Sequence, residues 1–260
     1  MKIQLIRHAT LWLEYGSRKF LIDPMFAKAG ANPPVMNSAN DRRNPLVPLP
    51  MGVAVDQLLH PDAVVVTHLH PDHWDEAAAM LLPKTTPILC QPGDESHFES
   101  LGFTRVSPIV NDLEFGRVSL VRTGGQHGTG EIGQMMGSVS GFVFRAPCEP
   151  TLYLAGDTIW CEEVIQALDD HHPDVVVVNA GGARFLTGGP ITMDDDQIVS
   201  LCRHAPDTQV IAVHMDAINH CLVTRSDLRR RLEAEGLTQQ VAIPEDGEWV
   251  NVTTDHLPAN

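Results

Sequence analysis

The sequence has no long hydrophobic run. Nowhere among its 260 residues does an apolar stretch approach the roughly 18 residues that a membrane-spanning helix needs. The start of the chain, residues 1–4, lacks the longer apolar core of a secretory signal peptide. We therefore expect a cytoplasmic protein without a membrane span.

Cysteine is scarce and follows no pairing motif. The chain has 5 cysteines, an odd number, and none of them belongs to a C-x-x-C pair. This pattern excludes a disulfide framework and a thiolate zinc site as the basis of the fold. We expect buried thiols at Cys90, Cys148, Cys161, Cys202 and Cys221.

Basic residues are also few. Lys and Arg number 18 against 33 Asp and Glu, so the formal net charge is -15. A field of this sign repels a phosphate backbone, which argues against nucleic acid and for a small-molecule substrate. Hydrophobic residues make up 43% and charged residues 20%, the balance of a soluble globular protein. Because no segment has the composition of a linker, we expect a single domain over residues 1–260.

The apolar patterns predict mixed strands and helices. Strands at residues 3–7, 10–14 and 19–22 open the chain, and Gly16 and Ser17 supply a hairpin turn between the last two. Further strands are expected at residues 63–66, 88–89, 118–121, 139–144, 151–154, 174–178, 209–213 and 248–252, and helices at 74–82, 94–101, 162–168, 194–202 and 225–235.

The order of these elements predicts the architecture. Each half of the chain begins with antiparallel strands and later offers a Val-rich strand, residues 63–66 and 174–178. We therefore predict an α/β (α+β) protein, a four-layer αββα sandwich of two mixed sheets with helices on the outer faces. Residues 24–61 form a long loop rich in Pro, Asn and Gly, which is either functional or mobile, or a solvated connector.

The most informative segment is residues 67–73, with the sequence THLHPDH, directly after a Val-rich strand. In extended chain, side chains two positions apart point the same way, so His68 and His70 can share one metal ion. As the chain turns, Asp72 and His73 are redirected and can serve a second metal. Three imidazoles and a carboxylate at a strand end cost desolvation and repulsion unless a cation compensates them. The segment therefore predicts a metal site that needs further ligands from elsewhere in the chain.

The H-x-H-x-D-H run, with a His, an Asp and a His at later strand ends, resembles the metallo-β-lactamase superfamily. Within it, the chain is most similar to the metal-dependent hydrolases typified by L-ascorbate 6-phosphate lactonase and N-acyl phosphatidylethanolamine phospholipase D. Matching stretches span nearly the whole chain: residues 7–10 (RHAT), 20–24 (FLIDP), 44–45 (NP), 125–127 (GQH), 155–158 (AGDT) and 212–214 (AVH).

The resemblance implies a two-metal site. His68, His70 and His127 would hold the first metal, Asp72, His73 and His214 the second, and Asp157 would bridge them. Ligand type leaves zinc, manganese and iron open, and zinc is our first choice.

The sequence leaves the roles of several further residues open. His220 competes with His214 as a ligand, but the strand-end position favours His214; His220 is then a substrate-facing or supporting group, or a histidine at a helix start. Asp23 is expected to anchor the metal loop by hydrogen bonds, and His8 to be a site or a core residue. Arg184 is a candidate for binding a carboxylate or phosphate of the substrate, or a surface arginine.

The chemistry of such a site is hydrolysis. Two divalent cations lower the pKa of a bridging water enough to supply hydroxide near neutral pH, and they polarise the attacked group. Asp72 would orient the water or pass a proton. We therefore expect a binuclear metallohydrolase that acts on a small ester, lactone or phosphodiester. The alternative is a binding or sensing protein of the same fold that retains the metals without turnover, and either protein is compatible with a homo-oligomer.

Overall fold

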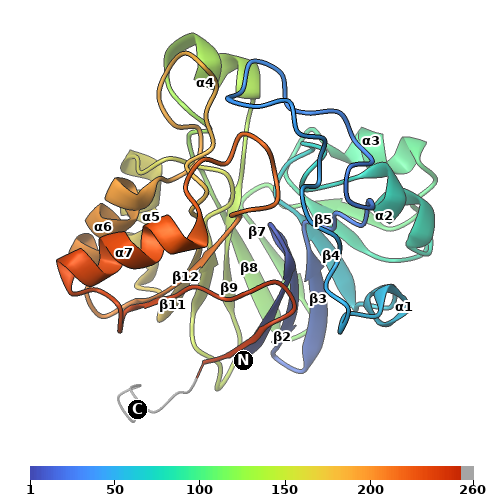
Figure 1. Ribbon diagram of the computed structural model, residues 1–260. Coiled ribbons are helices and arrows are strands. Elements are labelled where there is room, and N and C mark those ends of the chain that lie inside the picture. Colours follow the sequence, from blue (N-terminus) through green and yellow to red (C-terminus); the bar gives the residue numbers. More distant parts are fainter. Residues whose placement is uncertain (253–260) are drawn as a thin grey trace.

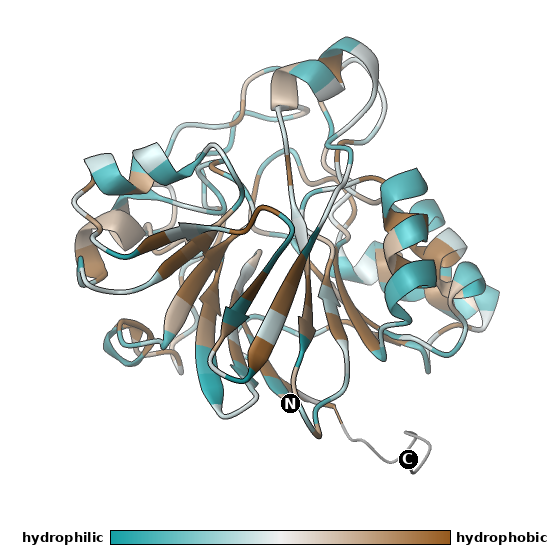
Figure 2. Ribbon diagram, turned by 180° about the vertical axis from the view of Figure 1, so that it is seen from behind, coloured by the Kyte–Doolittle hydropathy of each residue, from teal (hydrophilic) through white to brown (hydrophobic). Residues whose placement is uncertain are grey.

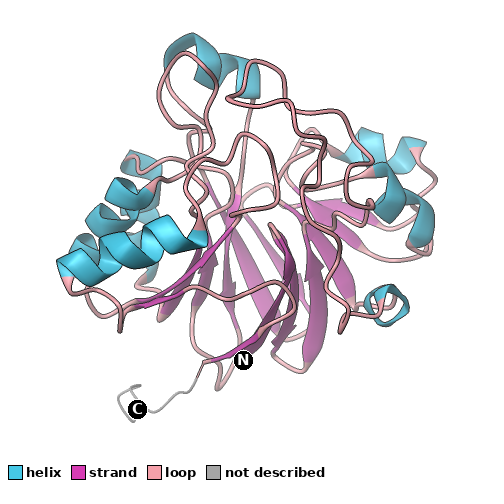
Figure 3. Cartoon of the chain, viewed as in Figure 1, coloured by secondary structure: helices cyan, strands magenta, loops and turns pink. Residues whose placement is uncertain are grey.

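Two seven-stranded β-sheets face each other at the centre of the computed structural model, which describes residues 1–252 (Figure 1). Helices cover the outer face of each sheet, and the strands lie between them (Figure 3). The order of layers is therefore helix, sheet, sheet, helix. The predicted αββα sandwich of two mixed sheets is confirmed.

The first sheet combines an antiparallel and a parallel half. Strands β14, β1, β2 and β3 pair antiparallel, whereas β3, β4, β5 and β6 pair parallel. In spatial order the strands are β14 (Trp249–Asn251), β1 (Lys2–Arg7), β2 (Thr10–Tyr15), β3 (Arg18–Ile22), β4 (Ala63–Val66), β5 (Ile88–Cys90) and β6 (Val106–Pro108).

The second sheet repeats this division. Strands β7 to β10 pair antiparallel, and β10 to β13 pair parallel. In spatial order they are β13 (Val241–Ala242), β12 (Gln209–Val213), β11 (Val175–Asn179), β10 (Leu152–Leu154), β9 (Gly141–Arg145), β8 (Val118–Thr123) and β7 (Asp112–Phe115).

Apart from α4, the helices divide between the two outer faces. Within residues 1–252, none combines the length and the apolar character that a membrane crossing needs. Helix α4 (Gly130–Met136) has no buried residue and stands at the top of the molecule, over the strand ends (Figure 1). The first sheet carries α1 (Val55–Leu58), α2 (Glu76–Leu81) and α3 (Glu95–Ser100), and the second carries α5 (Glu162–His171), α6 (Asp195–His204) and α7 (Arg225–Glu235).

The core follows from the two-residue period of the strands. In β11, Val175 and Val177 point between the sheets, whereas Val176 and Val178 pack under the helices of the second sheet. Hydrophobic colour accordingly concentrates in the strands, and the outward helix faces are hydrophilic (Figure 2). A strand buried on both faces needs a continuous apolar run, which is why the Val-rich segments were recognisable in the sequence.

Some element boundaries differ from expectation. The helix predicted from residue 74 begins at Glu76, because the backbone N–H groups of His73 and Trp74 both donate to the carbonyl of His70 and form a turn. Asp75 then caps the helix by accepting a hydrogen bond from the Ala78 N–H at 2.7 Å. The short elements α1, α4, β6, β7 and β13 were not predicted.

The cysteines are free, as expected. Cys90 and Cys202 are buried, and Cys161 and Cys221 are partly buried. The expectation of a buried thiol is wrong for Cys148, which is exposed in the turn after β9.

Candidate metal centre

All predicted ligands lie at one end of the sandwich. The H-x-H-x-D-H run follows β4, while His127 follows β8, Asp157 follows β10 and His214 follows β12 directly. Within the second sheet β8, β10 and β12 run in the same sense, so their carboxyl ends meet at one edge. This edge faces the loop after β4, at the top in Figure 1.

A first cluster consists of His68, His70, His127 and Asp157. One possible ligand atom from each lies within 4.8 Å of those of the others. Nδ1 of His70 is 2.9 Å from Nε2 of His68 and 3.2 Å from Nε2 of His127. Nitrogen atoms this close to one another need either a shared proton or a common cation. The cluster therefore has the composition and spacing of a divalent metal site.

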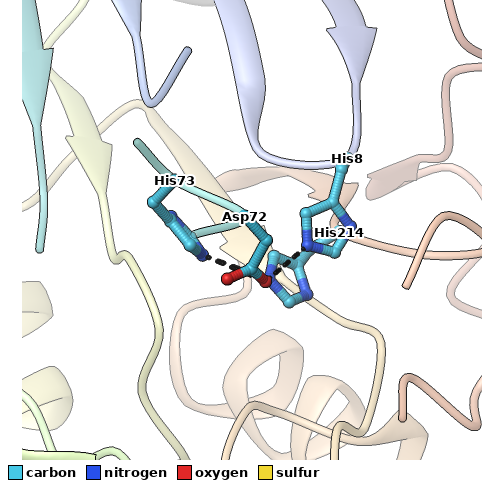
Figure 4. Close-up of side chains that lie close together, drawn as sticks. All are labelled: His8, Asp72, His73 and His214. Carbon is cyan, nitrogen blue, oxygen red and sulfur yellow. Dashed lines mark hydrogen bonds and ion pairs between the residues drawn. The ribbon is translucent and has the colours of Figure 1, made fainter. Parts of the chain in front are cut away.

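A second cluster consists of His8, Asp72, His73 and His214 (Figure 4). Nε2 of His73 lies 3.3 Å from Nε2 of His214. Oδ2 of Asp72 lies 3.5 Å from Nε2 of His214 and 3.8 Å from Nε2 of His73. The structure thus brings together all three residues predicted for the second metal and adds His8.

Asp157 lies between the two clusters. Its Oδ2 atom is 3.4 Å from Nε2 of His127 in the first cluster and 3.3 Å from Nε2 of His73 in the second. Its Oδ1 atom is 3.3 Å from Nε2 of His214. Asn179 also donates a hydrogen bond from Nδ2 to Oδ1 at 2.5 Å. One carboxylate can therefore reach both clusters, which is the position that a bridging ligand requires.

Hydrogen bonds behind the imidazoles orient three of them. Nδ1–H of His127 donates to the carbonyl of Ile191 at 2.6 Å, and Nδ1–H of His73 donates to Oδ2 of Asp23 at 2.7 Å. The Thr67 hydroxyl donates to Asp23, so it accepts from Nδ1–H of His68 at 3.1 Å. In each ring the Nε2 lone pair is then free toward the cluster, as a metal ligand needs. The donor set fits divalent cations.

Asp23 has the predicted anchoring role. It accepts hydrogen bonds from the backbone N–H and the hydroxyl of Thr67, each at 2.8 Å, in addition to the one from His73. The expectation of a hydrogen-bond anchor for the loop is confirmed.

The charges of the site favour a cation. Burial by itself would raise the pKa of Asp157, but the facing imidazoles of His214 and His73 hold that pKa well below its usual value. Burial would lower the pKa of His73, but the surrounding carboxylates, Asp157 and Asp23 foremost, raise it well above the ordinary range. Three carboxylates with little exposure to solvent thus attract positive charge to one point.

His8 and Asn179 extend the set beyond the predicted ligands. His8 is fully buried, and its Nε2 atom lies 3.0 Å from Oδ2 of Asp72. The sequence left the role of His8 open, and it indicated Asn179 only as the first residue of a loop, 179–193, that could line the substrate pocket. A signal for Asn179 does exist, since it is the polar residue that ends the Val-rich strand β11 beside β10.

His220 and Arg184 lie beside the clusters rather than in them. The His220 side chain is 6% exposed, its ring lies 6.2 Å from that of Phe185, and burial lowers its pKa to about 4. Arg184 donates from Nη2 to Oδ2 of Asp194 at 3.2 Å, so its charge already has a partner. Its backbone N–H donates to the carbonyl of His220. Substrate binding by Arg184 stays a prediction.

The long loop 24–61 is held against the site. The buried Arg7 guanidinium donates to the carbonyls of Met25, Ala27 and Val47 at 2.8, 2.9 and 3.1 Å. Farther along, the loop is fixed by Asn219, which lies next to His220.

Asn219 is 1% exposed and bonds to the loop through its side chain and its backbone. Its side chain accepts from Nδ2 of Asn44 at 2.8 Å and from the N–H of Val35 at 2.9 Å. Its own Nδ2 donates to the hydroxyl of Ser38 at 2.6 Å and to the carbonyl of Asn40 at 2.8 Å. These contacts fix residues 35–44 in place, so this part of the loop is not a freely moving connector.

Comparison with known proteins places the chain in a family. A family model described as a beta-lactamase superfamily domain matches residues 18–215. The UPF0173 protein YddR of Bacillus subtilis is 38% identical over 252 residues, which cover 95% of this chain and 98% of that protein.

Two solved structures are similar over nearly the whole chain. An isothiocyanate hydrolase from Delia radicum gut bacteria has 38% sequence identity and a TM-score of 0.92, and the match covers 97% of this chain and 99% of that one. A possible metal-dependent hydrolase from Veillonella parvula has 37% identity and a TM-score of 0.93, with the same coverage. The finer resemblance to the ascorbate-phosphate lactonase and phospholipase D group has no counterpart among these matches.

Proposed function

The chain belongs to the beta-lactamase superfamily as a metal-dependent hydrolase of the UPF0173 family, and on that premise we propose that it works with two metal ions. The observation that supports this proposal is the position of Asp157, within 3.4 Å of imidazole nitrogens in both clusters. We propose one catalytic domain, residues 1–260, in the cytoplasm, with zinc as the first candidate metal and manganese or iron as alternatives.

The proposed ligand sets follow the two clusters. His68, His70 and His127 would hold the first ion, Asp72, His73 and His214 would hold the second, and Asp157 would serve both. When bound, such an ion pair lowers the pKa of a shared water and polarises the oxygen of the substrate. The protein supplies the fixed positions through Asp23, Thr67 and the carbonyl of Ile191.

Asp72 and His220 are the proposed catalytic groups. The Asp72 side chain is 16% exposed, against 3% for Asp157, so it is the ligand carboxylate that a substrate can approach. We propose that it orients the attacking water or passes its proton. Because burial lowers the pKa of His220 to about 4, its ring is neutral near pH 7 and can exchange hydrogen bonds with a substrate.

The proposed substrate is a small ester, lactone or phosphodiester, each with an electrophilic carbon or phosphorus atom. The relative named isothiocyanate hydrolase supports a second candidate, an isothiocyanate, whose central carbon is also attacked by water. The 38% identity to that relative over 97% of this chain favours its inclusion. The net charge of -15 disfavours a nucleic acid.

Metal content and turnover test the proposal together. The purified protein is expected to hold close to two transition-metal ions per chain, measured by elemental mass spectrometry, and a chelator should abolish turnover reversibly. Hydrolysis is then measured on a panel of lactones, carboxylic esters, phosphodiesters and isothiocyanates. Thermal shifts on the same panel identify ligands that bind without turnover, which would favour the sensing alternative.

Asp157→Ala is the decisive variant. It should lower turnover at least about 100-fold and leave a folded, metal-poor protein, because it removes the ligand that both clusters share. The exposed Asp207 supplies the control, Asp207→Ala, which should keep parental activity and metal content. Parental turnover by a folded Asp157→Ala variant would refute the two-metal mechanism.

A further inference from the structure

We propose that His8 is a positioning residue of this centre, which holds Asp72 through its side chain and His214 through its backbone. The inference rests on the proposed two-metal function and adds a residue outside the predicted ligand sets. His8 comes from the turn between β1 and β2 in the first sheet, whereas His214 follows β12 in the second. It therefore joins the two sheets at the point where the second cluster forms.

Three contacts place His8 against this cluster. Its Nε2 atom lies 3.0 Å from Oδ2 of Asp72. Its carbonyl accepts a hydrogen bond from the backbone N–H of His214 at 3.0 Å. The two imidazole rings lie against each other, with centroids 3.6 Å apart (Figure 4).

The backbone of His8 argues for a role of its side chain. Arg7 pairs with Thr10, so His8 and Ala9 form a two-residue turn, and His8 has a φ of +62°. Glycine is the usual choice for a turn residue with positive φ, because a Cβ atom strains this conformation. A histidine held here, fully buried, points to a function that glycine cannot supply.

The surroundings of Nδ1 show whether His8 acts as a metal ligand or as a positioning residue. Nδ1 of His8 is buried and has no hydrogen-bond partner among residues 1–252. If Nε2 offered its lone pair to a cation, Nδ1 would carry the hydrogen and leave a buried donor without an acceptor. An unfilled acceptor is the more tolerable state. The hydrogen is therefore on Nε2, from which it donates to Asp72.

This arrangement has a local consequence. The side-chain hydrogen bond of His8 goes to Asp72, and its ring lies near those of His73 and His214, all three of the second cluster. Loss of its hydrogen bond should weaken the binding of the second metal ion and leave the binding of the first unchanged. Groups that orient metal ligands typically contribute 10–100-fold to affinity, about the size of effect expected here.

The experiment compares two substitutions of His8 whose side-chain amide nitrogens lie at different distances from the backbone. In His8→Gln the amide nitrogen can take the place of Nε2, whereas in His8→Asn it stops near Nδ1 and cannot reach Asp72. Asn tolerates positive φ well, so a defect in His8→Asn is not a backbone effect. His172→Asn is the matched control, since His172 is exposed, has a φ of +43° and ends α5.

Zinc content is measured for each folded protein at a series of buffered free-zinc concentrations. We expect the parent, His8→Gln and His172→Asn to fill two sites alike, and His8→Asn to fill one site normally and the other about 10–100-fold more weakly. Parental binding by His8→Asn, or an equal loss in His8→Gln, would overturn the positioning role. A parent that binds fewer than two zinc ions would instead overturn the two-metal proposal, and this inference with it.

Discussion

Oδ2 of Asp23 lies 2.7 Å from Nδ1 of His73, so a carboxylate at the end of β3 orients an imidazole in the loop after β4. Asp23 also accepts two hydrogen bonds from Thr67 at the start of that loop. One side chain thus fixes both the loop and the direction of a metal-ligand lone pair. Replacing Asp23 should therefore weaken metal binding although every proposed ligand is still present.

We expect Asp23→Asn to weaken metal binding about 10–100-fold, because the amide presents a donor where Thr67 and His73 already donate. Competition with a chelator of known affinity measures the change. Asp169→Asn is the control, because Asp169 pairs with His204 at the same 2.7 Å distance but on the surface. Equal metal affinity in both variants would contradict the assigned role of Asp23.

Asn219→Ala should loosen the loop 24–61. The change leaves the buried Asn44 and the partly buried Val35 without hydrogen-bond partners, and we expect the free energy of unfolding to fall by about 3 kcal/mol. Urea unfolding measures the loss, and limited proteolysis should find new cleavage within residues 32–46. Asn111→Ala, at an exposed position, should change the free energy of unfolding by less than about 0.5 kcal/mol. Resistance to proteolysis equal to that of the parent would argue against a clamped loop.

Gly181→Ala should distort the end of β12. A Cβ atom at this position would lie 2.2 Å from the carbonyl oxygen of His214 and 3.0 Å from Cβ of Cys221. Because the first neighbour is backbone, the strand end must shift, and we expect a loss of about 1–3 kcal/mol in the free energy of unfolding. The shift should also lower the metal content. Gly189→Ala meets no atom within 4 Å and serves as the control; a stable, fully metallated Gly181→Ala protein would disprove the close approach.

His220 should make stability depend on pH. Its side chain is buried beside Asp72, His214, Asp157 and His127, and burial foremost lowers its pKa to about 4. An unfolded histidine titrates near pH 6.5. Between these values the unfolded chain binds a proton that the folded protein does not, so the free energy of unfolding falls as the pH drops below about 6.5.

For the metal-free protein, the His220 contribution to this loss is about 2 kcal/mol between pH 7 and pH 5. Urea unfolding at both pH values measures it. His220→Gln removes the group and should shrink the pH-dependent loss, whereas His60→Gln, at an exposed position, should leave it at the parental size. An unchanged loss in His220→Gln would mean that His220 takes up its proton equally in the folded protein and in the unfolded chain, against a lowered pKa.

Where local signals were strong, the predicted elements coincide with the structure. The expected bounds of β12 (Gln209–Val213) and α7 (Arg225–Glu235) are the observed ones. Helix α7 begins at a capping box between Thr224 and Asp227 and ends at Gly236, which has a φ of +70°. A Thr followed three residues later by an acidic residue, and a Gly after the last turn, are helix start and stop signals that can be read in the sequence. Weak signals failed: β7 is an edge strand of four residues, and the two apolar residues that alternate with its acidic ones, Leu113 and Phe115, are only partly buried, so its pattern is too short to stand out.

The sequence by itself determined the two-sheet architecture, the dense H-x-H-x-D-H run and its place after a buried strand. These depend on hydrophobic periodicity and on ligand spacing within a few residues, which a chain carries locally. Only the tertiary structure decided that His8 contacts Asp72, 64 positions farther along the chain. It also decided that Asn219 holds the loop 24–61, where its partner Asn44 is 175 positions away. Contacts of this range follow from how two sheets face each other, and no local pattern encodes that geometry.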